Sequence, residues 1–470
     1  MSLTTDIPEL GSLVTGAVLA PADQGYADAA VGFNLATEHR PDYVVRAADA
    51  QDVVATVGYA RATGRRVAVQ ATGHGAAAAG PGTVLVVTSD LDTLTVDPAS
   101  RTATLGAGVR WQQVLDAAAP HGLGGLCGSS PGAGVVGYTL GGGLSPIGRT
   151  FGWAADNVRS IDVVTPDGVL RTVDAGHDPE LFWALRGGGA AFGIVTAMTI
   201  DLVEVPALYG GGIFVDATTA DVPRVLRIWR DWAEALPETA NPSVARLNLP
   251  DLPMVPEPLR GKAVVHVRFA FVGDVAEGER LIAPLRAALP EPLLDAVGPL
   301  PVPAFAAIHA DPVDPMPFVD RGVLLAKLPD AALDAFAEAT SPAAGLPFVL
   351  SEIRLLGAAF ARPPAVPNAV AGRSAPYFLD SVGMLVPPIA EHVSGALATI
   401  VERMLPWSTG GTTTNIAGGV DPEAVERLRA GFGPETVARL DALRAEVDPD
   451  GLLDPAARWT SPPLLPLHGV

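Results

Sequence analysis

The sequence has very little lysine and cysteine, and it lacks a long uninterrupted apolar run. Among its 470 residues, Lys262 and Lys327 are the only lysines and Cys127 is the only cysteine. A single cysteine excludes an intramolecular disulfide, and the absence of a Gly-Lys-Ser or Gly-Lys-Thr sequence excludes a Walker-type phosphate loop. Charge, glycine or proline interrupts every apolar stretch, so we expect no membrane span and no membrane partner.

Basic charge is also scarce, because the formal net charge is −20. This excess of acid disfavours nucleic acid as a partner and favours a small-molecule ligand. The histidines are scattered without an HExxH or CxxC pair, so we expect no metal site. No serine stands in a Gly-x-Ser-x-Gly frame, which argues against a serine hydrolase. The N-terminus lacks the basic start of a signal peptide, and we expect a cytoplasmic protein.

Apolar residues make up 49% of the chain, enough for two domains with buried cores. Apolar periodicity and turn residues predict strands and helices along most of it. The predicted strands are 43–46, 66–70, 84–88, 94–97, 101–105, 161–164, 169–173, 194–202, 263–271 and 348–356. The predicted helices are 52–62, 111–119, 222–236, 422–432 and 434–446. Between Gly122 and Gly152 glycine is so dense that we expect neither helix nor strand.

Glycine gathers in three loops within the first 200 residues, at 73–75, 137–143 and 185–193. Glycine is used where the backbone takes a positive φ or approaches another group closely, and consecutive backbone N–H groups in such loops hold phosphate oxygens. The three loops therefore predict one large ligand that carries a diphosphate, held without basic side chains.

A dinucleotide-type fingerprint occurs at Gly132-Ala133-Gly134-Val135-Val136-Gly137, with Asp156 at the spacing of a ribose-binding acid. The mechanism of that fingerprint needs a strand before it and a helix after it. Here 128–131 reads Gly-Ser-Ser-Pro, and the glycine-rich 138–143 follows. We therefore predict that the chain does not have a Rossmann fold.

The segments 69–75, 137–143, 156–158 and 181–196 match a known family in order and spacing, and 440–453 matches its closing segment. They resemble the vanillyl-alcohol-oxidase (PCMH-type) FAD-binding flavoproteins, specifically the berberine-bridge-enzyme-like branch. The resemblance implies an α+β protein with an extended FAD held between two subdomains. Its second, substrate domain is built on an antiparallel sheet covered by helices. We place the FAD domain at 1–205, the substrate domain at 206–416 and a returning C-terminal segment at 417–470.

The same resemblance implies which residues bind FAD. These lie in or near the glycine loops, or, for Asn415, directly before the C-terminal segment: Gln70, Ala71, Thr72, Gly73, His74, Gly75, Ser129, Ser130, Gly134, Gly137, Tyr138, Gly141, Gly142, Gly193, Ile194, Val195 and Asn415.

His74 occupies the position that the family commonly joins covalently to the flavin, so we expect such a link. The alternative is a histidine that packs against the ring. Gln70 and Thr72 depart from the family's usual arginine and glycine. Ser130 stands where some relatives add a second link through cysteine, and Cys127 lies three residues too early, so we expect it to be a small apolar filler.

The proton acceptor of the family, a tyrosine in a Tyr-x-Asn motif, is missing. Thr413 stands in its place before Asn415, and a threonine hydroxyl has too high a pKa to act as a base. We expect the catalytic groups in the substrate domain, with Glu352, Arg354 and Tyr377 as candidates. Glu352 and Arg354, two apart on a strand, share one face that is turned either to solvent or to the flavin. For His266 and His309 we expect satisfied core or loop positions.

The resemblance thus implies an FAD-dependent oxidase of a small, largely apolar secondary metabolite, with hydride transfer to flavin N5 and reoxidation by O₂. The missing base leaves a second hypothesis open: an FAD-bound cyclase, for example of a [4+2] addition, with no net redox change. A flavin-binding protein without turnover is a third.

Overall fold

The computed structural model describes residues 9–418 and 422–453, which fold around three large β-sheets. The first sheet has the order β1 (Ala17–Leu19), β2 (Tyr43–Arg46), β4 (Thr83–Val87) and β3 (Arg66–Gln70). Strand β4 lies between β2 and β3 and is parallel to both, while β1 is antiparallel to β2. Helix α2 (Ala50–Thr63) connects β2 to β3, begins where Asp49 caps two backbone N–H groups, and ends at Gly64, whose φ is +68°.

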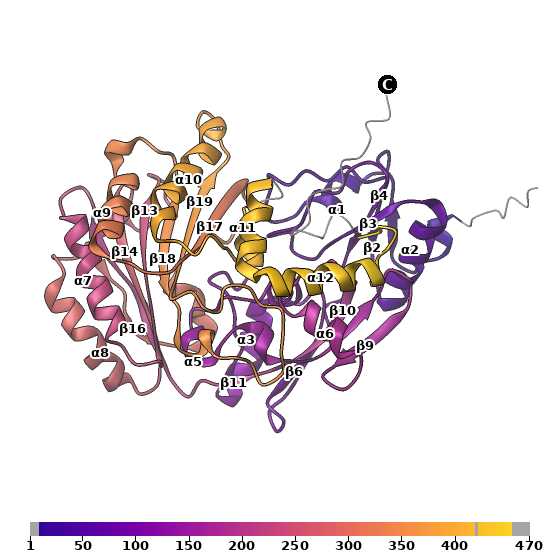
Figure 1. Ribbon diagram of the computed structural model, residues 1–470, viewed down its shortest axis with the longest axis horizontal. Helices are drawn as coiled ribbons and strands as arrows, with labels where there is room; N and C mark the ends of the chain where they lie inside the picture. Colours follow the sequence, from indigo (N-terminus) through magenta and orange to yellow (C-terminus); the bar gives the residue numbers. More distant parts are fainter. Residues whose placement is uncertain (1–8, 419–421, 454–470) are drawn as a thin grey trace, which may run out of the picture.

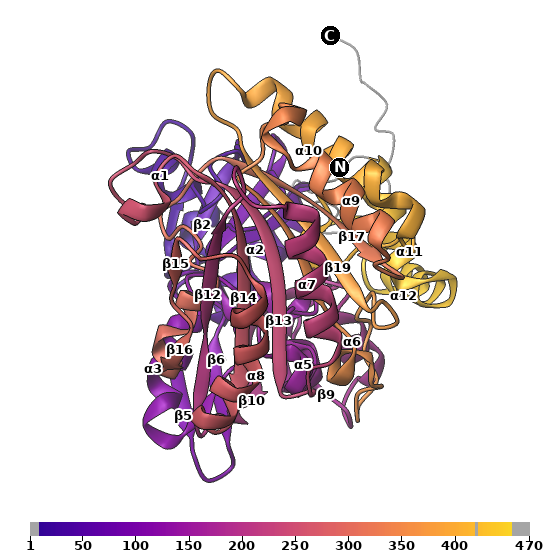
Figure 2. The same ribbon diagram turned by 90° about the vertical axis from the view of Figure 1, so that its left-hand side faces the viewer.

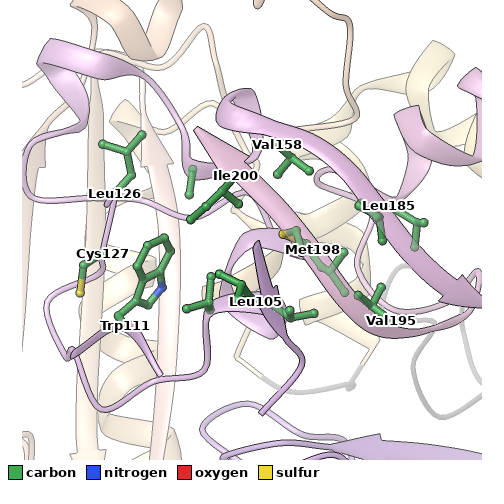
Figure 3. Close-up of a cluster of buried hydrophobic side chains, with 14 of the residues drawn as sticks. Leu105, Trp111, Leu126, Cys127, Val158, Leu185, Val195, Met198 and Ile200 are labelled. Carbon is green, nitrogen blue, oxygen red and sulfur yellow. The ribbon is translucent and has the colours of Figure 1, made fainter. Parts of the chain in front are cut away.

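The second sheet is antiparallel throughout, as the predicted hairpins require. Its order is β5 (Leu94–Asp97), β6 (Thr102–Gly106), β10 (Ile194–Asp201), β8 (Val158–Val164) and β9 (Leu170–Asp174). A large apolar core lies against this sheet, and Figure 3 shows Leu105, Trp111, Cys127 and Met198 within it. Cys127 is fully buried there, as expected of a small apolar filler.

The third sheet is also antiparallel and carries its helices on one face. Its strands are β12 (Leu208–Asp216), β13 (Ala240–Asn248), β14 (Ala263–Val272), β15 (Leu294–Asp295), β16 (Gly298–Leu300), β17 (Phe318–Leu325), β18 (Leu350–Leu355) and β19 (Tyr377–Met384). The helices are α7 (Val222–Glu234), α8 (Val275–Ala288), α9 (Asp330–Ala339) and α10 (Ala390–Met404). They cover the outer face, and the other face turns toward the N-terminal half (Figure 1, Figure 2).

After the third sheet the chain returns to the N-terminal half. Helices α11 (Pro422–Phe432) and α12 (Pro434–Val447) contribute Leu428, Leu440 and Leu443 to the core of the second sheet. The backbone N–H of Val67 donates to the carbonyl of Leu452 at 2.8 Å, beside the first sheet. The α+β fold class is confirmed. The domain limits at 205/206 and 416/417 stay a prediction.

The glycine-dense stretch differs from expectation, because it contains regular structure. Strand β7 (Leu123–Gly124), which pairs with β11 (Val203–Glu204), and helices α4 (Val135–Leu140) and α5 (Gly148–Phe151) all lie within it. Tertiary packing overrides the low helix propensity of glycine here. One of our two grounds for rejecting the Rossmann fold, that no helix follows the fingerprint, was therefore wrong; the other is confirmed, because no strand directly precedes the fingerprint. The chain still does not have a Rossmann fold, because the second sheet, next to the fingerprint, is antiparallel, whereas the sheet of a Rossmann fold is mostly parallel.

The remaining helices are α1 (Tyr26–Ala30), α3 (Trp111–Ala118) and α6 (Pro179–Leu185). Within residues 9–418 and 422–453, none of the helices combines the length and apolar character that crossing a bilayer takes. Over the same residues, no group of three histidine, cysteine or acidic side chains is arranged to hold a metal ion.

Candidate functional site

The three glycine loops meet at one place. The hydroxyl of Thr72 in the first loop accepts a hydrogen bond from the N–H of Gly134 in the second, at 3.2 Å. The N–H groups of Gly187 and Gly189 in the third loop donate to the carbonyl of Leu140 at 2.9 and 3.0 Å. Segments more than 100 residues apart in the sequence therefore form one backbone-lined site.

Thr414 and Asn415, directly before the C-terminal segment, contact two of these loops from one side. Asn415 Nδ2 donates to the carbonyl of Tyr138 at 2.9 Å, and Thr414 Oγ1 donates to the carbonyl of Gly187 at 2.8 Å. A Cβ at Gly141 would overlap Oδ1 of Asn415. Gly141 is thus required by the close approach of Asn415, which holds the second loop in place.

The first loop is shaped by a contact with the segment before β2. Gly73 has a φ of +73°, and a Cβ there would overlap the backbone of Gly32. Gln70 is buried beneath the loop, where its Nε2 donates to the carbonyl of Ala30 at 3.2 Å. Gln70 therefore supports the loop from below.

His74 projects from this loop and stacks on Phe33, with ring centroids 3.9 Å apart and planes 5° from parallel. Its Nδ1 lies 3.0 Å from Thr72 Oγ1. Burial, together with the nearby charge of Arg110, lowers the pKa of His74 to about 4. The imidazole is therefore neutral at physiological pH.

Open space and unsatisfied polar atoms surround the junction of the loops. A Cβ at Gly137 would meet no atom within 4 Å. His74 Nε2 and the Tyr138 hydroxyl are buried and have no hydrogen-bond partner among the described residues. Such atoms are rare unless a ligand or water satisfies them. The site therefore fits a large ligand that approaches the backbone closely.

The other predicted cofactor residues divide into two sets. Ala71, Gly75, Ser129, Ser130 and Gly142 lie on the same loops, and Gly142 has a φ of +106°. Gly193, Ile194 and Val195 lie at the start of β10, and Ile194 and Val195 pair with β8. A Cβ at Gly193 would overlap Val163. The packing of two strands by itself accounts for glycine at this position.

The inner face of the third sheet carries a buried ionic cluster. Glu352 on β18 is 1% exposed; its Oε2 accepts from Arg354 Nε at 2.8 Å, and its Oε1 lies 2.8 Å from Arg268 Nη1. Burial raises the pKa of Glu352, but the two guanidinium groups outweigh it and hold the pKa well below its usual value. Glu352 and Arg354 share one face, as predicted, and this face is turned away from the covering helices.

Two histidines complete the cluster. His309 Nε2 lies 3.3 Å from Glu352 Oε1, and His266 Nδ1 accepts from Arg268 Nε at 3.1 Å. Burial, followed by the charge of Arg268, lowers the pKa of His309 to about 4, so its ring is neutral. Both histidines are buried, but His309 Nδ1 and His266 Nε2 have no partner within the described part of the chain. The expectation of satisfied histidines was wrong.

A small cavity of about 20 Å³ opens beside this cluster. Its walls are mostly apolar, from Leu144, Ile308, Leu356, Phe360 and two prolines, and its polar lining includes Ser145, Asn241, Arg268, His309 and Arg354. The loop that follows the second glycine cluster thus forms one wall, and the polar face of the third sheet forms another.

Tyr377 lies outside this cluster, on the other face of the sheet, and its catalytic role stays a prediction. It pairs with Leu355, whereas Arg354 pairs with Phe378, so Tyr377 points to the opposite face of the sheet. There its hydroxyl donates to Glu234 of helix α7. Burial and this carboxylate raise the pKa of Tyr377. Tyr377 packs the helices onto the sheet.

Comparisons with known proteins show which domain and which fold this site belongs to. Residues 41–174 match the family model described as FAD binding domain. The fold resembles that of 6-hydroxy-D-nicotine oxidase from Arthrobacter nicotinovorans, with a TM-score of 0.82, 24% identity and coverage of 98% of this chain and 99% of that one. It also resembles Physcomitrella patens BBE-like 1, with a TM-score of 0.80, 19% identity and coverage of 97% and 98%. The chain has an FAD-binding domain and the fold of the PCMH-type flavoproteins.

Sequence relatives of this flavoprotein agree with the cofactor. It is 31% identical over 195 residues to the (R)-6-hydroxynicotine oxidase of Paenarthrobacter nicotinovorans, which covers 41% of this chain and 43% of the relative. It is 34% identical over 185 residues to the FAD-dependent monooxygenase prx3 of Penicillium roqueforti, covering 38% and 36%. The alignments thus span less than half the length of these relatives.

FAD is the cofactor of this flavoprotein, and the loop junction suits it. The loops at 70–75, 129–138 and 141–142 would hold it by backbone groups, and His74 Nε2 and the Tyr138 hydroxyl are buried polar atoms on these loops without a partner among the described residues. Sequence reasoning missed Phe33, which stacks on His74, and Arg110, which donates to the carbonyl of Gly132 at 3.1 Å beside the loops. It also missed Arg268; the two-residue spacing of His266 and Arg268 on a buried strand was the available signal.

Proposed function

We propose that this flavoprotein is an FAD-dependent oxidase of a small, largely apolar molecule that carries at least one polar or acidic group. The names of its relatives, which include oxidases and monooxygenases, support this activity. The buried cluster on the inner face of the third sheet carries the proposal, because charged groups are seldom buried so completely without a function. When bound, FAD supplies a hydride acceptor that O₂ reoxidises.

His309 accepts the substrate proton in this proposal. Its ring is neutral, and Glu352 lies on the Nε2 side at 3.3 Å, so a proton on Nε2 leaves the lone pair of Nδ1 free. Nδ1 has no partner among the described residues, and His309 lines the cavity. Glu352 orients the ring and stabilises the imidazolium that forms, as a carboxylate does beside a catalytic histidine.

Arg354 and Arg268 bind and orient the substrate. Both guanidinium groups form ion pairs with one carboxylate, that of Glu352, and both line the cavity. This arrangement favours a substrate whose own oxygen atoms carry negative charge. The cavity as it stands has room for about one water molecule. In this proposal the apolar side chains of Leu144, Leu356 and Phe360 move apart to take the remaining, nonpolar part of the substrate.

The test is anaerobic mixing of the FAD-loaded protein with a panel of aromatic and heterocyclic amines, alcohols and hydroxy acids. We expect at least one compound to bleach the flavin absorbance. Admitting air is then expected to restore the absorbance and to yield hydrogen peroxide. His309→Gln is expected to slow bleaching about 100-fold or more, the usual contribution of a general base. If none of the compounds in the panel is oxidised or otherwise transformed, the proposal is contradicted.

A second candidate is an FAD-bound cyclase without net redox change. The observation that favours it is the residue at position 413. The family has a tyrosine base there, whereas this chain has the buried Thr413. A cyclase works by orientation and a few hydrogen bonds, so the missing base would not matter. Product formation from a polyene substrate without bleaching of the flavin distinguishes this activity from an oxidase.

A further inference from the structure

The segment before β2 is bound to the first glycine loop and to the residues that follow it. The N–H of Asn34 donates to the carbonyl of Gly73 at 3.1 Å. The N–H of Arg40 donates to the carbonyl of Ala79 at 2.6 Å, and the N–H of Ala79 in turn donates to Nδ1 of His39 at 3.1 Å. The connection between β3 and β4 is therefore held at Gly73 and again at Ala79, and one of the contacts at Ala79 uses a histidine side chain.

The contact with Ala79 fixes the protonation state of His39. A backbone N–H can only donate, so Nδ1 of His39 is an unprotonated acceptor and the neutral ring carries its proton on Nε2. Nε2 is buried and has no hydrogen bond of good geometry to the described residues. Burial lowers the pKa of His39, and a weaker interaction with the nearby Gln70 side chain raises it. His39 is therefore neutral near pH 7 and presents a buried N–H beside Gln70.

Gln70 offers the complementary acceptor. Its Nε2 donates to the carbonyls of Ala30 and Val31 at 3.2 and 3.4 Å, so its Oε1 points away from both. This Oε1 is buried and likewise has no hydrogen bond of good geometry within the described part of the chain. It lies beneath the loop, 2.9 Å from the place that a Cβ of Gly73 would take. The buried donor of His39 and the buried acceptor of Gln70 thus form one pair that supports the first loop.

We propose that His39 is a positioning residue for FAD binding, which together with Gln70 takes the place of the family's usual arginine at position 70 and holds the loop only while its ring is neutral. The proposal rests on FAD lying at the junction of the glycine loops, and it is independent of the substrate and of the reaction. An arginine stays charged at every physiological pH, whereas a histidine titrates. The exchange therefore makes the support of the loop dependent on pH.

Protonation of His39 adds a proton to Nδ1, where it faces the N–H of Ala79. Two donors then oppose each other, and the hydrogen bond is lost. The charged neighbours Glu38 and Arg40 are exposed and pair with each other, and His74, whose pKa is about 4, stays neutral above pH 5. The pKa of His39 is lowered in the folded protein from its usual 6.5, so the support is complete above pH 6.5 and is lost as the pH falls below it.

Titration of the FAD-free, full-length protein with FAD between pH 8 and pH 5 tests the proposal, with binding followed by the quenching of FAD fluorescence. The half-saturating FAD concentration of the wild type is expected to be constant above pH 6.5 and about tenfold or more higher at pH 5, the effect of one unsatisfied buried donor. His39→Phe is expected to need the higher concentration at every pH. Repeating the titration with His74→Gln removes both the titration of His74 and any covalent attachment.

Two variants separate the titration of His39 from a merely structural effect. His39→Asn keeps an acceptor for the N–H of Ala79 but does not titrate, so it is expected to bind FAD like the wild type at pH 7 and to lose the pH dependence. His177→Asn is the matched control, because the side chain of His177 is 80% exposed, and it is expected to keep the wild-type pH profile.

Hydrogen exchange of the Ala79 amide gives a second readout that needs no FAD. After correction for the intrinsic exchange rate, its protection is expected to fall below pH 6.5 in the wild type but not in His39→Asn. Wild-type FAD binding that is constant from pH 8 to pH 5, a His39→Asn protein with the wild-type pH profile, or a folded His39→Phe that binds FAD like the wild type at pH 7 would each overturn the proposal. Failure to oxidise any substrate would leave these measurements unchanged, so the proposed function is tested separately.

Discussion

Replacing Glu352 by glutamine would remove the carboxylate that forms ion pairs with both Arg268 and Arg354. Glutamine keeps the size and a hydrogen-bonding oxygen, so the substitution changes charge and little else. The Glu352 and Arg268 side chains are each 1% exposed, and that of Arg354 is 13% exposed. Water therefore cannot replace the lost partner. In Glu352→Gln the two buried guanidinium groups keep their positive charges but lose the negative charge of the Glu352 carboxylate.

The expected loss in the free energy of unfolding is about 3–5 kcal/mol, the usual cost of breaking a buried ion pair by removing one partner. Glu238→Gln is the matched control, because its ion pair with Arg362 joins side chains that are 56% and 59% exposed. That surface pair contributes about 1 kcal/mol or less. Adding Arg354→Met to Glu352→Gln is expected to recover part of the loss, since one unpaired guanidinium is removed.

The assay is urea unfolding of the FAD-loaded variants, repeated across pH. The pKa of Glu352 is lowered in the folded protein, from a usual value of 4.5, so its contribution is fully present above pH 4.5 and is lost as the pH falls below it. The difference in the free energy of unfolding between the wild type and Glu352→Gln is therefore constant around neutral pH and becomes smaller in acid. A Glu352→Gln protein as stable as Glu238→Gln at pH 7 would refute the reasoning.

Two further predictions follow from the glycine loops and the third sheet. Gly137 lies in helix α4 with open space around it, so Gly137→Ala is expected to raise the stability of the FAD-free protein by about 0.5–1 kcal/mol. It is expected to weaken FAD binding about tenfold or more, because its Cβ enters space that the protein leaves open. Gly141→Ala, whose Cβ overlaps Asn415, is expected to lower both stability and FAD binding. Titration of the FAD-free variants with FAD checks this, and equal effects in the two variants would contradict it. Tyr377→Phe is expected to cost about 1 kcal/mol of stability through its lost bond to Glu234 while turnover stays unchanged. A turnover rate that falls with unaltered stability would restore Tyr377 to the catalytic set.

Much of the local structure follows from the sequence. Strands 43–46, 66–70 and 94–97 are predicted to the residue, because alternation of apolar side chains and flanking turn residues act within a few positions. Helices α4 and α5 escaped prediction because the glycines that form them have poor helix propensity. In α5, Gly148 is packed against Phe360, which is more than 200 residues away in the sequence.

The sequence by itself determined the order of the local elements, the three glycine loops and the positions of His74, Glu352 and Arg354, because each depends on residue type and short-range spacing. The tertiary structure decided what these residues do. Strand register placed Tyr377 on the helix-covered face and Arg268 beside the carboxylate of Glu352. The fold brought His309, which lies outside the strands, to the same carboxylate. One residue of register reverses the face of every side chain in a strand. The contact between Thr72 and Gly134 likewise needs two loops that only the folded chain brings together.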